Sequence, residues 1–192
     1  MIADDPDIDA DWRGPFDFES DALFTDVAAG RITERDYWTQ RSTELADTLG
    51  LVDGASAMRR VFAADEARVV RSELVELARD LRAAGFRTGI LTNDLAKFHG
   101  GAWEDDLPSL TTFPVHVDLS HTATLKPHPE AYRLGVEAMG LPAEDVLFVD
   151  DQPVNVAGAL AAGMQAIRFD VVRPSASLAA IRNICGIPNP LS

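Results

Sequence analysis

Two adjacent aspartates, Asp150 and Asp151, are the residues of this sequence best placed to do chemistry. They follow the apolar run Val146 to Val149, which is typical of a parallel strand covered on both faces. Neighbouring carboxylates raise each other's pKa unless a cation or hydrogen-bond donors favour their charged forms. Mg²⁺ would relieve this repulsion, because it takes oxygen ligands, keeps several waters and needs only one or two carboxylates from the protein. The alternative is that the pair merely caps a turn and the following helix, since aspartate is common at helix N-termini.

Three more polar residues lie next to a predicted strand or turn. Thr92 and Asn93 come directly after the predicted strand Phe86 to Leu91. A hydroxyl and an amide there suit an oxyanion, because both hydrogen-bond phosphate oxygens without adding charge. Lys126 precedes a turn in which two prolines flank His128, and a lysine held in this way offers a point positive charge to phosphate or carboxylates. The alternatives are an ordinary turn and a solvated surface lysine.

The elements around the aspartates predict an α/β fold. A helix is expected over Asn155 to Ala162, with Gly163 as its stop, and a second strand over Met164 to Phe169. Strand, helix and strand in so few residues indicate a right-handed βαβ unit. Ligands bind just outside the carboxyl ends of such parallel strands, where the two aspartates are expected.

The N-terminal third is different in character. Residues 1–15 form an acidic leader, which we expect to be disordered. Residues 16–64 have helical spacing and predict a small helical cap subdomain, in which Thr33 and Asp36 resemble a capping box. Residues 65–192 are expected to form the α/β core.

Composition narrows the function classes. The 192 residues are 46% hydrophobic and 25% charged, which is typical of a globular protein with one sizeable core. The net charge of −14 disfavours nucleic acid as a partner. Every apolar run is shorter than the roughly 20 residues that a membrane span needs. The single Cys185 and the acidic first residues favour a reducing, cytoplasmic location.

Three stretches carry a family resemblance. ILTND, LKPHPEAY and VLFVDDQPVNVAGALAAGMQAIRF resemble the second, third and fourth motifs of the haloacid dehalogenase (HAD) superfamily. GRITERDYW is similar to the cap helices of its epoxide-hydrolase-like and phosphatase-like members, which have a small helical cap. The resemblance implies a Rossmann-like parallel sheet and a hydrolase site that acts on a small phosphorylated or acidic metabolite. The implied residues are Asp150 and Asp151 for Mg²⁺, Thr92 and Asn93 for the phosphoryl group, Lys126 as a bridge between the two, and Asn155 in support.

Two other families with similar ingredients are disfavoured. Response-regulator receiver domains place their acidic pair first in the chain, whereas here the pair comes last. A nicotinamide-binding Rossmann domain would carry G-x-G-x-x-G after a strand, and none follows any predicted strand.

The first HAD motif, a buried strand that ends in Asp-x-Asp, has no clear counterpart before the helical region. Asp9 and Asp11 have this spacing, but the residues before them are acidic and include a proline, unlike a buried strand. Covalent catalysis through an aspartyl phosphate depends on that first carboxylate. Three hypotheses follow. The chain is a pseudoenzyme that acts through binding or assembly, or an N-terminally shortened phosphatase or dehalogenase, or an enzyme that uses Asp9 and Asp11 or Asp150 and Asp151 differently.

The missing motif also bears on assembly. In the family its strand lies between the strand that ends at Thr92 and the strand that ends at Asp150. Its loss predicts unpaired backbone edges. The leader Met1 to Trp12 fills the position, or another chain does so by strand addition, or the two flanking strands pair directly. Assembly is the preferred expectation, with a homodimer as its simplest form.

Overall fold

The computed structural model describes residues 21–62, 70–99 and 107–189 of the chain. Asp9, Asp11 and the leader predicted over residues 1–15 therefore lie outside the described residues. The chain divides into two compact units. We call Met1–Val69 with Asp94–Leu107 the helical unit, and Val70–Asn93 with Pro108–Ser192 the α/β unit.

The described part of the helical unit contains α1 (Ala22–Ala28), α2 (Glu34–Leu49), α3 (Gly54–Phe62) and α6 (Leu95–His99). The predicted capping box is confirmed, because the Thr33 side chain accepts from the Asp36 N–H and the Asp36 carboxylate accepts from the Thr33 N–H. Gly50 ends α2 in the left-handed conformation, at φ 62°. Helices α2 and α3 bury a small apolar cluster between them, formed by Leu45, Ala46 and Ala57.

A buried carboxylate ties α1 to α2. Asp21 caps α1 by accepting from the N–H groups of Leu23 and Phe24. Its other carboxylate oxygen, Oδ2, accepts from the Tyr37 hydroxyl at 2.7 Å, and Arg41 of α2 donates to Oδ1, the oxygen that caps α1. The Asp21 side chain is fully buried. Burial would raise the pKa of this carboxyl, but the hydrogen bonds from Arg41, Tyr37 and the Phe24 N–H outweigh it and hold the pKa below 3.8.

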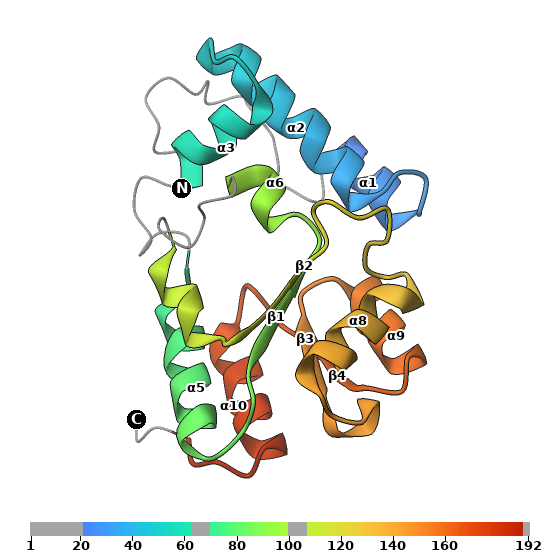
Figure 1. The fold of residues 1–192 in the computed structure, drawn as a ribbon. Helices are drawn as coiled ribbons and strands as arrows, with labels where there is room; N and C mark the ends of the chain where they lie inside the picture. Colours follow the sequence, from blue (N-terminus) through green and yellow to red (C-terminus); the bar gives the residue numbers. More distant parts are fainter. Residues whose placement is uncertain (1–20, 63–69, 100–106, 190–192) are drawn as a thin grey trace. The chain divides into compact units, whose positions relative to one another are not determined.

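The α/β unit contains four strands and four α-helices among its described residues (Figure 1). The strands are β1 (Gly89–Thr92), β2 (Val115–Asp118), β3 (Leu147–Asp150) and β4 (Gln165–Arg168). The α-helices are α5 (Ser72–Ala83), α8 (Pro129–Met139), α9 (Pro153–Ala161) and α10 (Pro174–Ile184), and two 3₁₀ turns are η2 (Pro108–Thr112) and η3 (Ala143–Asp145). Helices α8 and α9 contact each other, as do α5 and α10.

The predicted elements are present, with some corrections. The first strand begins at Gly89 instead of Phe86, whose side chain is exposed. Helix α5 begins at Ser72, with Arg71 at the N-cap position and no side-chain capping bond. Ile184, at the end of α10, is exposed.

The strands form two separate parallel pairs. β1 pairs with β2 from Gly89↔Val115 to Thr92↔Asp118, and β3 pairs with β4 from Leu147↔Gln165 to Asp150↔Arg168. Within the described chain no ladder joins β1 to β3. Direct pairing of these two strands, one of the three expectations for the missing strand, is therefore not what the described residues adopt.

One apolar core connects the two pairs. Its buried members are Tyr132, Val146, Phe148, Ala159 and Met164, and Leu91 of β1 packs against them. The rings of Tyr132 and Phe148 meet edge to face with centroids 5.5 Å apart. The core thus fixes α8 and α9 against β3 and holds β1 beside them. Among the helices described, none is long and apolar enough to cross a membrane.

Candidate functional site

Asp150 ends β3 with both carboxylate oxygens engaged. Oδ1 accepts from the Gln152 N–H at 2.9 Å and from the Asn155 side-chain amide at 3.0 Å. Oδ2 accepts from Lys126 Nζ at 2.7 Å. The side chains of Asp150 and Lys126 are only 8% and 10% exposed, so this ion pair is largely shielded from water. Asp150 therefore caps the turn before α9. It also pairs with Lys126, and capping alone does not require that pair.

Lys126 is held in place through its backbone. Its N–H donates to the Asn93 side-chain oxygen at 2.8 Å, and the Asn93 amide donates back to the Lys126 carbonyl at 3.3 Å. Asn93 is itself buried. The Lys126-Pro127 peptide bond is cis, and His128 then caps α8 by accepting from the Glu130 N–H. Asn93, predicted to hold a phosphoryl group, therefore uses its side chain to position Lys126.

Asp151 differs from its neighbour, because it is exposed. Its pKa is raised above 3.8, first by the desolvation of its carboxyl and then by the charge of Asp150, while Lys126 and Arg168 act in the opposite direction. Arg168 also donates from Nε to the Asp151 carbonyl at 3.1 Å.

These side chains fit a weakly held Mg²⁺. Asp150 and Asp151 supply hard oxygen donors, and Asp150 Oδ2 makes only one hydrogen bond, so it keeps a lone pair for a cation. No cluster of three or more acidic, His or Cys side chains suited to a metal occurs within the described residues. A cation here would keep most of its waters.

The structure thus brings together four of the predicted site residues. Asn93, Lys126, Asp150 and Asn155 form one connected set of hydrogen bonds. Thr92 lies at the end of β1, beside Asn93, and its carbonyl accepts from the Leu119 N–H.

Two further residues support the site and were not predicted from the sequence. The Tyr132 hydroxyl donates to the Asn155 carbonyl at 2.7 Å. Burial and then the charge of Asp150 raise the pKa of Tyr132, which keeps it a protonated donor. The second is Arg168, opposite Asp150 in the β3 and β4 register. The only signal for Tyr132 was its place on the helix after Lys126, and for Arg168 its place at the end of a predicted strand.

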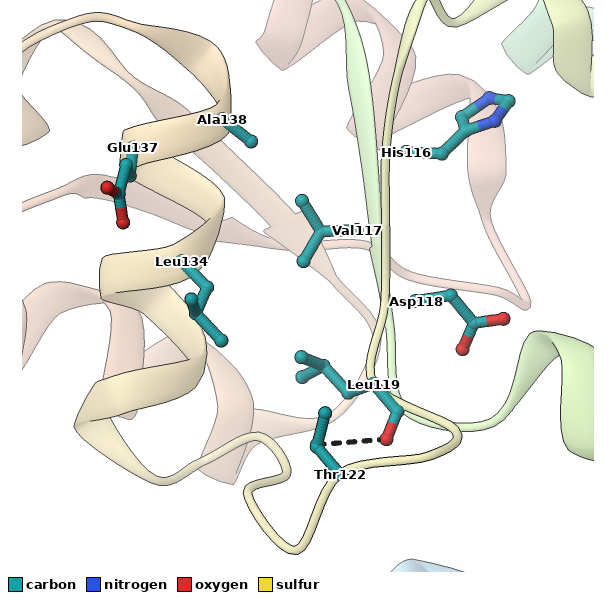
Figure 2. A pocket seen from close by; sticks show the side chains of 8 residues that line it. All are labelled: His116, Val117, Asp118, Leu119, Thr122, Leu134, Glu137 and Ala138. Carbon is teal, nitrogen blue, oxygen red and sulfur yellow. Dashed lines mark hydrogen bonds between the residues drawn. The ribbon is translucent and has the colours of Figure 1, made fainter.

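A separate hollow of about 440 Å³ lies between β2 and α8 (Figure 2). Val117 points toward Leu134 and Ala138 of α8, whereas His116 and Asp118 point to the other side of the strand. The hollow contains none of the residues of the Asp150 network. We therefore do not regard it as the candidate site.

More than one α/β family places a lysine and paired aspartates at the carboxyl ends of parallel strands, and comparison with known proteins specifies the family. The haloacid dehalogenase-like hydrolase model matches residues 11–163. The chain is 36% identical over 92 residues to haloacetate dehalogenase H-2 of Moraxella sp. (strain B). That match covers 45% of this chain and 38% of the relative, so the chain spans well under half of that relative's length.

Solved structures agree on the fold. The HAD-hydrolase YfnB of Bacillus subtilis, bound to magnesium, is 19% identical with a TM-score of 0.63, covering 86% of this chain and 78% of that one. A HAD phosphatase from Thermococcus onnurineus is also 19% identical, with a TM-score of 0.62 and coverage of 85% and 78%. The chain belongs to the haloacid dehalogenase-like hydrolases, with an α/β core and a helical cap.

Proposed function

We propose that the α/β unit binds Mg²⁺ together with the phosphoryl or carboxylate group of a small metabolite, and that it hydrolyses such compounds slowly or not at all. The observation that carries the proposal is the shielded contact of 2.7 Å between Lys126 Nζ and Asp150 Oδ2. An incoming oxyanion would pair with the Lys126 ammonium group, and an incoming Mg²⁺ would pair with the Asp150 carboxylate.

The Lys126 side chain supports an exchange of partners. An anion that arrives with a divalent cation would take the ammonium group of Lys126, and the cation would take the carboxylate of Asp150. Both charges stay neutralised throughout, so neither group is left buried and unpaired. Asn93 holds the Lys126 backbone during the exchange. Mg²⁺, when bound, would add electrostatic stabilisation of negative charge on the ligand.

Slow turnover is proposed because the central carboxylate of the described site is already engaged by hydrogen bonds. Covalent hydrolysis needs a carboxylate that can attack the substrate. Asp150 makes three hydrogen bonds and so is poorly suited to attack. The other candidates, Asp9 and Asp11, lie outside the described residues.

A second candidate function is an active phosphatase or dehalogenase. It is favoured by the 36% identity to a haloacetate dehalogenase and by the family match from residue 11 onward. In this case the nucleophile is Asp9 or Asp11, or a carboxylate beyond the printed sequence. Efficient turnover would distinguish this function from the first.

Titration calorimetry tests the cation site on wild type, Asp150→Asn and the control Asp145→Asn, an exposed aspartate of η3. We expect weak Mg²⁺ binding in wild type and the control, and none in Asp150→Asn. An equal response of all three proteins would show that Asp150 is not a ligand.

The anion site is tested with inorganic phosphate in the presence of Mg²⁺. Lys126→Met should abolish binding, whereas Arg133→Met, which removes an exposed arginine of α8, should not. Circular dichroism checks that each variant is folded. Unchanged phosphate affinity in folded Lys126→Met would contradict the proposed role of Lys126.

A further inference from the structure

Arg168 lies at the carboxyl end of β4, beside the aspartate pair. It is in register with Asp150 of β3, and residues in register on neighbouring strands point to the same face of a sheet. Lys126 donates to the Asp150 carboxylate, and Arg168 donates to the Asp151 carbonyl. Each residue of the aspartate pair is therefore bonded to a cationic side chain.

The guanidinium group of Arg168 is held at one nitrogen. Nε donates to the Asp151 carbonyl at 3.1 Å, and among the described residues this is the one hydrogen bond that the side chain makes. Both terminal nitrogens keep their N–H donors, and the residue is exposed, so a ligand in solvent can reach them. A planar guanidinium group that is fixed in this way suits the two oxygens of a carboxylate or a phosphate, which it can bind through two parallel hydrogen bonds.

The Asp151 carboxylate is close to both cations and is free to take a new partner. Desolvation and the charge of Asp150 raise its pKa, whereas the charges of Lys126 and Arg168 act in the opposite direction. Among the described residues, no side chain donates a hydrogen bond to this carboxylate. Arg168 thus contributes positive charge at the aspartate pair without occupying the oxygens that Mg²⁺ would use.

The charges at this end of the strands indicate what kind of ligand fits. Two cationic side chains accompany two carboxylates, so Mg²⁺ bound by the carboxylates would leave both cations to pair with anionic groups. The Lys126 side chain is only 10% exposed, whereas Arg168 is open to solvent. The two cations therefore offer separate positions, one shielded and one accessible.

We infer that Arg168 is a specificity-determining residue, which selects small metabolites with two separate anionic groups, one bound by Lys126 and the other by Arg168. The inference rests on the proposed function, in which Lys126 binds the first anionic group. A compound with a single anionic group would use Lys126 alone and would bind more weakly.

Titration calorimetry on the full chain, in excess Mg²⁺, tests this inference with phosphonates, whose carbon–phosphorus bond resists phosphatases. Propylphosphonate carries one anionic group. Phosphonoacetate, phosphonopropionate and phosphonobutyrate add a carboxylate on linkers of increasing length. We expect at least one of these three to bind wild type roughly tenfold more tightly than propylphosphonate does. Arg168→Met should remove this preference and leave the affinity for propylphosphonate unchanged.

Arg87→Met is the matched control. Arg87 is also an exposed arginine that donates to a backbone carbonyl, that of Met139, but it precedes β1 and so lies away from the carboxyl ends of the strands. This variant should keep the preference of wild type. Circular dichroism checks that each variant is folded, and Arg168→Gln replaces Arg168→Met if the latter is not.

Three results would overturn the inference. Equal affinity of wild type for all four phosphonates would do so and leave the proposed function standing, as would a preference that survives in folded Arg168→Met. Equal weakening of all four in Arg168→Met would show that Arg168 only holds the Asp151 backbone in place. If wild type bound none of the four, the proposed function would fail, and the inference would fail with it.

Discussion

Asn93 and Lys126 illustrate what the sequence predicted at the level of single residues and what it did not. The order of Thr92, Lys126 and the aspartate pair was enough to predict which side chains gather at one edge of the strands. The direction of the Asn93 side chain was not predictable, because an amide at a strand end can face a ligand or the backbone of a distant turn. Its partner lies 33 positions further along the chain.

We predict that Asn93→Ala weakens phosphate binding although Asn93 does not contact the anion itself. The substitution leaves the Lys126 N–H and C=O without their partner, which should lower the free energy of unfolding by about 1 to 3 kcal/mol. Calorimetry with inorganic phosphate measures the affinity, and urea unfolding measures stability. The control Thr92→Val removes the hydroxyl but no described hydrogen bond, so its stability should stay near wild type. Phosphate affinity unchanged in Asn93→Ala would remove Asn93 from the site.

Asp21 predicts a pH dependence of the helical unit. Its folded pKa lies below the ordinary value of 3.8, so its stabilising effect is complete above that value and is lost as the pH falls through 3.8 toward the folded pKa. Asp21→Asn keeps a capping side chain but breaks the buried pair with Arg41, which should cost about 3 to 5 kcal/mol near neutral pH.

Urea unfolding is followed by tryptophan fluorescence, to which Trp38 in contact with Tyr37 contributes along with Trp12 and Trp103. The difference between wild type and Asp21→Asn should shrink in acid. Asp47→Asn, an exposed position of α2, serves as the control. A difference that is constant with pH would show that Asp21 is not the group responsible.

At the level of elements, local signals set most helix ends, whereas packing set the strand ends. The capping box at Thr33 was readable, because it requires particular residues at the N-cap and three positions later. Strand β1 starts three residues later than predicted, since hydrophobicity alone does not indicate where pairing with β2 begins.

The contact between α8 and α9 depends on a glycine. A Cβ on Gly158 would lie 2.6 Å from the Tyr132 hydroxyl, which donates to the Asn155 carbonyl. Gly158→Ala gains about 1 kcal/mol of helix propensity. It should lose more through overpacking and the strained hydrogen bond, for a net destabilisation of about 1 to 2 kcal/mol.

Gly135→Ala is the matched control, because it is also a glycine within a helix, yet its Cβ would meet only the end of the Leu91 side chain at 3.1 Å. We expect its stability to stay within about 1 kcal/mol of wild type. Thermal unfolding by circular dichroism compares the two variants. Equal stabilisation of both would show that Tyr132 can move away without loss.

At the scale of the whole molecule, the described residues combine a connected set of polar side chains with strands in two separate parallel pairs. The Asp150 network is connected by hydrogen bonds that lie entirely within the α/β unit. Both strand pairs belong to the same unit, and no described strand joins β1 to β3. Family membership was predictable from three motifs, but the substrate was not, because motifs at strand ends specify the chemistry of binding and not the shape of the ligand.

Steady-state hydrolysis of an aryl phosphate by the full chain, at saturating Mg²⁺, tests most directly the claim that this site binds without efficient turnover. We predict a rate close to the uncatalysed background, because Asp150 in the described site already makes three hydrogen bonds and is poorly suited to covalent attack, which leaves orientation and electrostatics. Asp9→Asn and Asp11→Asn should then leave that rate unchanged. Efficient hydrolysis that either substitution abolishes would contradict the account and identify the leader as the source of the nucleophile.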